Sequence, residues 1–296
     1  MSNAEHGTVA GQAGDEARLT RLVAREGASP RAVRAFRRHV LAWYRANGRD
    51  LPWRHCTDPY AVLVSEIMLQ QTQVNRVCGR WERFIERFPA FEALAAAPLS
   101  AVLDEWHGLG YNRRAAHLRS LAQIVVSRHG GVLPCDEAGL RRLPGLGKAT
   151  AASVAVFACG SRAAFIETNI RAVYLHVFFA EREGVRDDEI LPIAVAALPG
   201  GEVVTWHWAL MDYGAALKRA VPNPSRRSAH HATQSRFEGS VRQLRGRVLR
   251  ALVTRGPLAD DELDDVAGGD RRLDETLSAL ERDGLIIRED EVWRVA

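Results

Sequence analysis

The middle of the chain reads Leu143-Pro144-Gly145-Leu146-Gly147-Lys148-Ala149-Thr150-Ala151. A helical pattern precedes this stretch, Pro144 and two glycines interrupt it, and an alanine-rich helix is predicted over residues 151–158. Gly145 and Gly147 allow backbone angles closed to other residues and a close approach to a partner. A turn that opens a helix also leaves N–H groups pointing outward, which suits a phosphate oxygen. The stretch therefore predicts two helices joined by a tight, phosphate-binding hairpin.

A carboxylate follows this hairpin in an apolar setting. The sequence there is Phe165-Ile166-Glu167-Thr168-Asn169-Ile170-Arg171. A buried carboxylate is costly unless it is used or paired, so the two segments together predict a DNA clamp with an acid beside it. Taken alone, the hairpin also fits a plain helix–turn–helix in an all-α core, because many helix turns contain glycine.

Further motifs lie upstream of the hairpin. They are Leu51-Pro52-Trp53-Arg54, Asp58-Pro59-Tyr60, Ser65-Glu66-Ile67-Met68-Leu69-Gln70-Gln71-Thr72-Gln73-Val74 and Gly108-Leu109-Gly110-Tyr111-Asn112-Arg113-Arg114-Ala115. In this order and spacing, the motifs resemble the helix-hairpin-helix (HhH-GPD) DNA glycosylase superfamily over about residues 30–225. Residues 65–74 are similar to the MutY-type adenine glycosylases rather than to endonuclease III. The resemblance implies a mainly α, two-lobed helix-hairpin-helix DNA glycosylase fold.

Four segments are expected along the chain. Residues 1–29, rich in Gly, Ala and Glu, are expected to be a disordered tail, and helical periodicity then marks a glycosylase domain over residues 30–225. A basic linker, 226–240, leads to residues 241–296, where three helical stretches precede two β-prone runs. This last segment is predicted to be a small winged-helix-like module.

The formal charge differs between these segments. Residues 241–296 hold ten arginines, no lysine and thirteen carboxylates, which gives −3, whereas residues 1–240 carry +7. Double-stranded DNA is therefore the expected partner. Because the tail is net acidic, a packing or protein-contact role suits it at least as well as DNA binding, and we expect DNA affinity to be largely independent of it.

Composition places the chain among ordinary globular proteins, with 47% apolar and 26% charged residues. No apolar run is long enough to span a bilayer, and the polar start is not typical of a signal peptide. We expect a cytoplasmic monomer, associated with the nucleoid if the source is bacterial, with no membrane partner.

The cysteines bear on the cofactor. Many relatives in the superfamily carry four clustered cysteines that bind a [4Fe–4S] cluster, just after the segment that reads Ala209-Leu210-Met211-Asp212-Tyr213-Gly214-Ala215 here. Residues 216–240 contain no cysteine, and the four in the chain, at 56, 78, 135 and 159, lack metal-ligand spacing. Since thiolates hold such clusters, we expect none, nor any other cofactor. Whether the hairpin binds a monovalent cation is left open by the sequence.

Two carboxylates are the candidate catalytic residues. Glu66 lies in an apolar helical run, and the matching glutamate of MutY-type enzymes protonates the adenine, a task that a raised pKa suits. A salt-bridged core acid is the alternative. Glu167 matches a residue that is nearly always aspartate in the superfamily and that stabilises the sugar cation and orients water. Its extra methylene keeps the charge but changes the reach.

The resemblance assigns further residues to DNA. Gln70, Gln71 and Tyr111 match residues that fill the gap left by a flipped base, although Tyr111 equally suits a loop aromatic packed on a helix. The other expected DNA contacts are Arg113, Gly145, Gly147, Lys148 and Thr150, and the residues expected beside the base pocket are Trp53 and Arg54. Trp53 is also a natural core residue. Arg114 is expected to contact phosphate or solvent.

Ala149 bears on the type of reaction. Endonuclease III-type enzymes have a lysine at this position that forms a Schiff base and cleaves the strand, and alanine cannot be a nucleophile. The resemblance therefore implies a monofunctional DNA N-glycosylase of base excision repair, with adenine opposite 8-oxoguanine or guanine as the first expectation for its substrate.

Two alternatives to that substrate and activity stay open. MutY-type enzymes recognise 8-oxoguanine through a long C-terminal domain related to nucleotide hydrolases, whereas the tail here is shorter. A thymine or uracil mismatch glycosylase on the same scaffold is therefore one alternative. A catalytically inactive damage-binding protein, motivated by Glu167, is the other.

Overall fold

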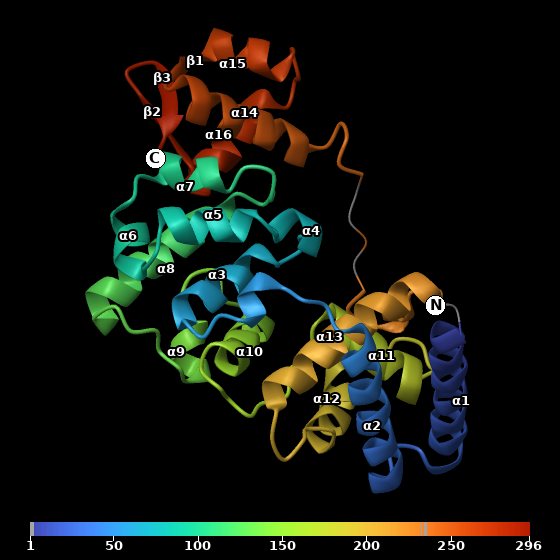
Figure 1. Ribbon diagram of the computed structural model, residues 1–296. Coiled ribbons are helices and arrows are strands. Elements are labelled where there is room, and N and C mark those ends of the chain that lie inside the picture. The colour runs from blue at the N-terminus through green and yellow to red at the C-terminus, as the bar shows by residue number, and fades with distance from the viewer. Residues whose placement is uncertain (1–2, 232, 234–235) are drawn as a thin grey trace. The chain divides into compact units, whose positions relative to one another are not determined.

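The computed structural model describes residues 3–231, 233 and 236–296, and these are mostly helical (Figure 1). The chain forms two compact units, each made from two separate stretches of sequence. Unit 1 comprises residues 1–50 and 155–233, and unit 2 comprises residues 51–154 and 234–296. None of the described helices has the length and apolar character needed to cross a membrane. The mainly α architecture confirms the predicted fold class.

Unit 1 is a helical unit centred on two tightly packed helices. Its elements are α1 (Asn3–Glu26), α2 (Pro30–Asn47), α11 (Thr168–Phe178), α12 (Asp187–Ala196), α13 (Val203–Ala220) and the 3-10 turn η2 (Pro224–Arg227). A Cβ at Gly214 of α13 would lie 2.2 Å from the carbonyl oxygen of Asn169, so only glycine permits this approach of α13 to α11. From α2, the buried Phe36 ring packs on Tyr174 and Trp206.

The expected disorder of residues 1–29 is wrong for the part that the structure describes, because α1 occupies most of it. Leu19 and Val23, one helical turn apart, are buried, and α1 packs on α2 and α11. The carboxylate of Glu16 also pairs with Nε2 of His176 at 3.1 Å, which lowers the pKa of Glu16. The Gly- and Ala-rich composition concealed a short apolar stripe that suffices to dock a helix.

The expected linker over residues 226–240 starts later than predicted. Ser225 and Ser228 are buried, and Oγ of Ser225 donates a hydrogen bond to the carbonyl oxygen of Thr168 at 3.1 Å. The guanidinium of Arg227 donates to the carbonyl oxygens of Leu175 and Ala180, near the carboxyl end of α11, where a cation is favourable. These contacts fix the start of the predicted linker on unit 1.

Unit 2 contains the motif-bearing part of the chain. Its first elements are η1 (Pro52–Arg54), α3 (Pro59–Met68), α4 (Val74–Val77), α5 (Arg80–Arg87), α6 (Phe91–Ala96), α7 (Leu99–Glu105), α8 (Arg113–His129), α9 (Glu137–Arg141) and α10 (Lys148–Phe157), whose last residues belong to unit 1. α8 packs on α3, α6 and α7. A helical pattern runs through residues 77–88 of the sequence, but Gly79, with φ +75°, separates α4 from α5.

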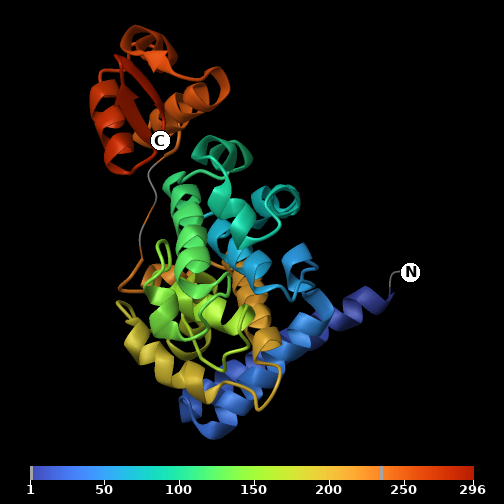
Figure 2. The same ribbon diagram turned by 90° about the vertical axis from the view of Figure 1, so that its left-hand side faces the viewer.

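The C-terminal module has the three helices and the hairpin that were predicted, and one additional strand. It consists of α14 (Val241–Arg255), β1 (Leu258–Ala259), α15 (Asp260–Ala267), α16 (Leu273–Arg282), β2 (Ile286–Glu289) and β3 (Val292–Val295) (Figure 2). The sheet order is β1-β3-β2 with both pairs antiparallel, and Trp293 lies opposite Leu258 and Arg288. The two-residue β1 is too short to leave an alternating pattern in the sequence.

Candidate functional site

The predicted hairpin joins α9 to α10. Gly145 has φ +83°, and a Cβ there would lie 3.1 Å from Cβ of His117, so both backbone angle and space require glycine. Leu143 and Leu146 are buried and anchor the turn, while Gly147 and Lys148 are exposed at the start of α10. The first N–H groups of α10 lack intrahelical partners, as at every helix N-terminus. The hairpin thus presents donors and a lysine at the surface, which suits an anion.

Gln70 ties this hairpin to the end of α3. Its Nε2 donates to the carbonyl oxygen of Gly145 at 3.2 Å and to Oγ1 of Thr150 at 3.1 Å. Gln70 and Thr150 were both expected at the DNA. Their hydrogen bond holds the hairpin to the end of α3, and a contact of either residue with DNA stays a prediction.

Two motif residues adopt backbone angles that non-glycine residues rarely take. Gln71 has φ 53° and Tyr111 has φ 49°, and both side chains are exposed. Left-handed non-glycine residues cost about 1–3 kcal/mol each and gather at functional sites. Both residues line one cleft of unit 2, with a volume of about 940 Å³, as do Gly145 and Gly147 of the hairpin. Three separate motifs therefore meet at one opening.

Arg114 holds the loop of one of these motifs to the end of α3. Its guanidinium donates to the carbonyl oxygens of Ile67, Met68 and Gln70 at 2.6–2.9 Å, and to those of Leu109 and Gly110 at 3.0–3.2 Å. Burial lowers the pKa of Arg114 to about 10, so the side chain is cationic at neutral pH, where the carboxyl end of a helix favours a cation. The expected contact with phosphate or solvent is wrong.

Arg114→Met is expected to lower the free energy of unfolding by roughly 3–5 kcal/mol, because it leaves several buried carbonyl oxygens without a donor. Urea unfolding followed by circular dichroism would measure this change. Arg113→Met is the matched control, since Arg113 forms an exposed ion pair with Asp283 at 3.3 Å and its loss should change stability by less than about 1 kcal/mol. Equal effects of the two variants would contradict the role given to Arg114.

Glu66 lies on an otherwise buried helix. Within residues 60–68, all of which the structure describes, it is the one residue that is not fully buried. Glu66 is therefore half-buried on a helix whose other residues over this stretch are buried. The role of Glu66 as a general acid stays a prediction.

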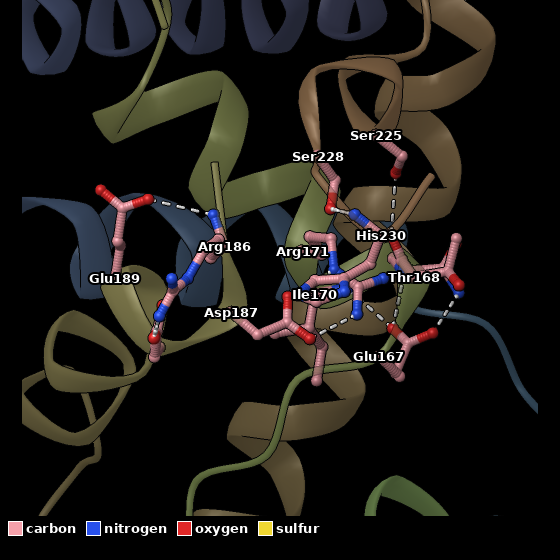
Figure 3. A network of polar contacts seen from close by, with 12 residues as sticks. Glu167, Thr168, Ile170, Arg171, Arg186, Asp187, Glu189, Ser225, Ser228 and His230 are labelled. Carbon is pink, nitrogen blue, oxygen red and sulfur yellow. Dashed lines mark hydrogen bonds and ion pairs between the residues drawn. The ribbon is translucent and has the colours of Figure 1, made fainter. Parts of the chain in front are cut away.

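Glu167 is the N-cap of α11 (Figure 3). Its Oε1 accepts hydrogen bonds from the backbone N–H groups of Asn169 at 2.8 Å and Ile170 at 2.7 Å, and its Oε2 accepts one from Nδ2 of Asn169 at 3.2 Å. Burial raises the pKa of Glu167, while the two backbone N–H groups, Lys218 and Arg171 oppose that rise. Arg171 is itself held by both carboxylate oxygens of Asp187, at 2.7 Å each. The carboxylate of Glu167 is thus fixed in direction.

The remaining predicted residues occupy different environments. Trp53 is 6% exposed and packs edge-to-face on Trp81 with a centroid distance of 6.1 Å, so its ring belongs to the core of unit 2. Arg54 is half-buried, and Arg113 and Lys148 are exposed. A role of Trp53 and Arg54 beside a base pocket stays a prediction.

The segment that follows Gly214 does not fit an iron–sulfur cluster. Residues 216–240 contain no thiolate. The two buried hydroxyls there already have partners, since Ser225 donates to Thr168 and Ser228 accepts from the backbone N–H of His230 (Figure 3). Within the described part of the chain, no three His, Cys, Asp or Glu side chains are grouped so that they could hold a metal ion.

Comparison with known proteins identifies the family. The family model described as "HhH-GPD superfamily base excision DNA repair protein" matches residues 64–186. Over 270 residues, the chain is 36% identical to the adenine DNA glycosylase of Mycolicibacterium smegmatis, which covers 83% of this chain and 91% of that protein. The chain belongs to the HhH-GPD superfamily. The resemblance inferred from the sequence motifs is thereby confirmed.

Other proteins similar to this chain are named as glycosylases for thymine or uracil rather than for adenine. The thymine/uracil-DNA glycosylase of Methanothermobacter thermautotrophicus is 30% identical over 195 residues, covering 65% of this chain and 88% of that protein. A solved structure of a thermostable thymine-DNA glycosylase matches with a TM-score of 0.55 and 29% identity, covering 62% of this chain and 86% of that one. Membership of the superfamily therefore leaves the base to be determined.

Proposed function

We propose that the protein is a monofunctional DNA glycosylase that flips a mispaired base out of duplex DNA and hydrolyses its N-glycosidic bond, with adenine opposite 8-oxoguanine or guanine as the substrate. The observation that carries the proposal is the cleft at which the Gln71 motif, the Tyr111 loop and the Gly145–Gly147 hairpin meet. The substrate is supported by the similarity to an adenine DNA glycosylase over 83% of the chain.

Each site residue has a separate task in the proposed reaction. The hairpin N–H groups and Lys148 hold a backbone phosphate, and Gln71 and Tyr111 fill the space that the flipped nucleotide leaves. Glu66 donates a proton to the base, which makes the base a better leaving group. The bond between sugar and base then breaks, and the positive charge that develops on the sugar is stabilised by the carboxylate of Glu167. Glu167 finally takes a proton from the attacking water, which completes hydrolysis.

A thymine or uracil mismatch glycosylase is the second candidate, favoured by the relatives with those names. One experiment separates the candidates. The protein is incubated with labelled duplexes containing A:8-oxoguanine, A:G, T:G, U:G or hypoxanthine, and alkali then reveals abasic sites on a gel. Cleavage of the adenine-containing strand supports the proposal, and cleavage only at T:G or U:G replaces it with the second candidate.

Excision without strand scission is expected, because Ala149 at the exposed start of α10 offers no amine. Product strands should break only after alkali, and borohydride should trap no covalent protein–DNA adduct. Ala149→Lys is the matched positive control, since it places an amine at this position and should make trapping measurable. Efficient trapping by the unaltered protein would show that another amine, such as Lys148, is a nucleophile.

A further inference from the structure

The charges of the C-terminal module are separated by element. α14 contains five arginines and no acidic residue. The thirteen carboxylates of residues 241–296 all lie after α14, in α15, α16, the sheet and the connecting turns. The net charge of −3 therefore conceals one strongly basic helix.

Four of these arginines line the cleft at which the three motifs meet. They are Arg242, Arg245, Arg247 and Arg250, and together with Arg76, Arg113 and Arg114 they give the cleft seven arginines. The only carboxylate among the described lining residues is Asp283, which pairs with Arg245 and Arg113. Exposed aromatic side chains, Tyr111 and Phe237, also line it. Cations gathered with so little compensating charge repel one another unless an anion lies between them.

Contacts within unit 2 hold α14 beside the motif loops. Nη1 of Arg242 donates to the phenol oxygen of Tyr111 at 3.2 Å, and its guanidinium lies over the Tyr111 ring, 5.8 Å from the centroid. Arg250 donates to Nε2 of His107, and the pKa of His107 is lowered by burial and by Arg250 and Arg80, so this ring is a neutral acceptor. Arg247 is exposed, and its charge contributes to lowering the pKa of Asp270 in the turn before α16. Arg242 and Arg250 are thus held beside the motif loops, and Arg245 and Arg247 line the same cleft.

We propose that α14 is a second phosphate-binding element of the DNA site, lining the same cleft as the hairpin. This inference rests on the proposed function. The distance from Arg242 to Arg250 is eight residues, about 12 Å along a helix, which is roughly the length of three or four phosphates on one strand of a duplex. Arg242 exchanges the Tyr111 phenol for a phosphate when Tyr111 enters the base stack. DNA affinity should then depend on the tail, contrary to the expectation drawn from its net charge.

The test compares two double variants of the full chain that remove the same charge. Arg247→Ala/Arg250→Ala alters the cleft, and Arg255→Ala/Arg271→Ala alters exposed arginines of the same module that do not line it. Binding of an undamaged 20-base-pair duplex is measured by fluorescence anisotropy over a range of salt concentrations. The cleft variant should raise Kd roughly tenfold and reduce the slope of log K against log salt by about 2, as the loss of two phosphate contacts predicts. The control variant should keep the Kd and slope of the unaltered protein.

Because Arg250 contacts His107, the double variant could weaken binding by disturbing how the module packs. A single variant at another arginine separates this effect from the loss of a phosphate contact. Arg247→Glu changes an exposed side chain that lines the cleft, and it should still weaken binding more than Arg255→Glu, which changes an exposed arginine outside the cleft. Unchanged duplex binding by both cleft variants overturns the inference. Tighter duplex binding by these variants also overturns it, because α14 would then block the access of DNA to the cleft. Failure of the proposed function gives a different result. If duplex binding depends on α14 but no base is excised, the phosphate-binding role of α14 stands and the glycosylase activity does not.

Discussion

Glu66→Gln is expected to lower the excision rate by roughly 10²- to 10⁴-fold, the usual contribution of a general acid. Glutamine preserves the size and polarity of the side chain but cannot protonate the departing base. Single-turnover excision of adenine from a duplex with 8-oxoguanine would measure the rate, and anisotropy would measure Kd. Duplex binding should stay nearly intact, because the phosphate contacts are assigned to the hairpin and to α14.

Glu86→Gln is the control for this variant, because Glu86 is an exposed carboxylate of the same unit. It should excise at the rate of the unaltered protein. If Glu66→Gln retains full activity, Glu66 is a structural acid of α3 and another group must protonate the base. If it unfolds or loses duplex binding to the same extent as activity, the general-acid role has no support.

The helices of this protein could be predicted from periodicity because most of them bury one apolar stripe. The pattern predicts helices over residues 32–47, 113–129, 242–254, 259–266 and 271–283, and α2, α8, α14, α15 and α16 begin and end within a few residues of these limits. The prediction was wrong for α1, where Leu19 and Val23 form too short a stripe to stand out from a Gly- and Ala-rich composition. Tertiary packing on α2 and α11 stabilises such a helix, and a single sequence does not show that packing.

The functional motifs could be located from the sequence, but the sequence did not show which of their residues make hydrogen bonds within the protein. Gln70 and Arg114 belong to motifs that resemble DNA-contacting segments, and both also make partly buried hydrogen bonds to backbone or hydroxyl groups far away in the chain. These partners lie 44 to 80 positions away in the chain, and no local pattern indicates them. Likewise, averaging charge over residues 241–296 hid the basic helix α14, because the acids lie on other elements of the module.

Substitution of Glu167 distinguishes an enzyme from a damage-binding protein. Glu167→Gln should lower the excision rate by roughly 10²-fold or more, because a neutral amide cannot stabilise the sugar cation. Its amide oxygen can still accept from the N–H groups of Asn169 and Ile170, so α11 should remain capped and duplex binding should persist. Burial raises the pKa of Glu167, and the rate of the unaltered protein should therefore fall as the pH is lowered through that raised value.

Glu167→Asp provides the sharper comparison, because it keeps the charge and shortens the side chain by one methylene. Aspartate is also a better N-cap than glutamate, so a loss of rate could not be attributed to fraying of α11. If the site is adapted to the longer acid, the carboxylate retreats by about 1 Å or more and the rate should fall roughly 10²-fold. An unaltered protein inactive on every duplex, together with an active Glu167→Asp variant, would instead show that the longer side chain disables catalysis. In that case the cleft would serve DNA binding alone, whereas the proposed mechanism requires the unaltered protein to be the faster of the two.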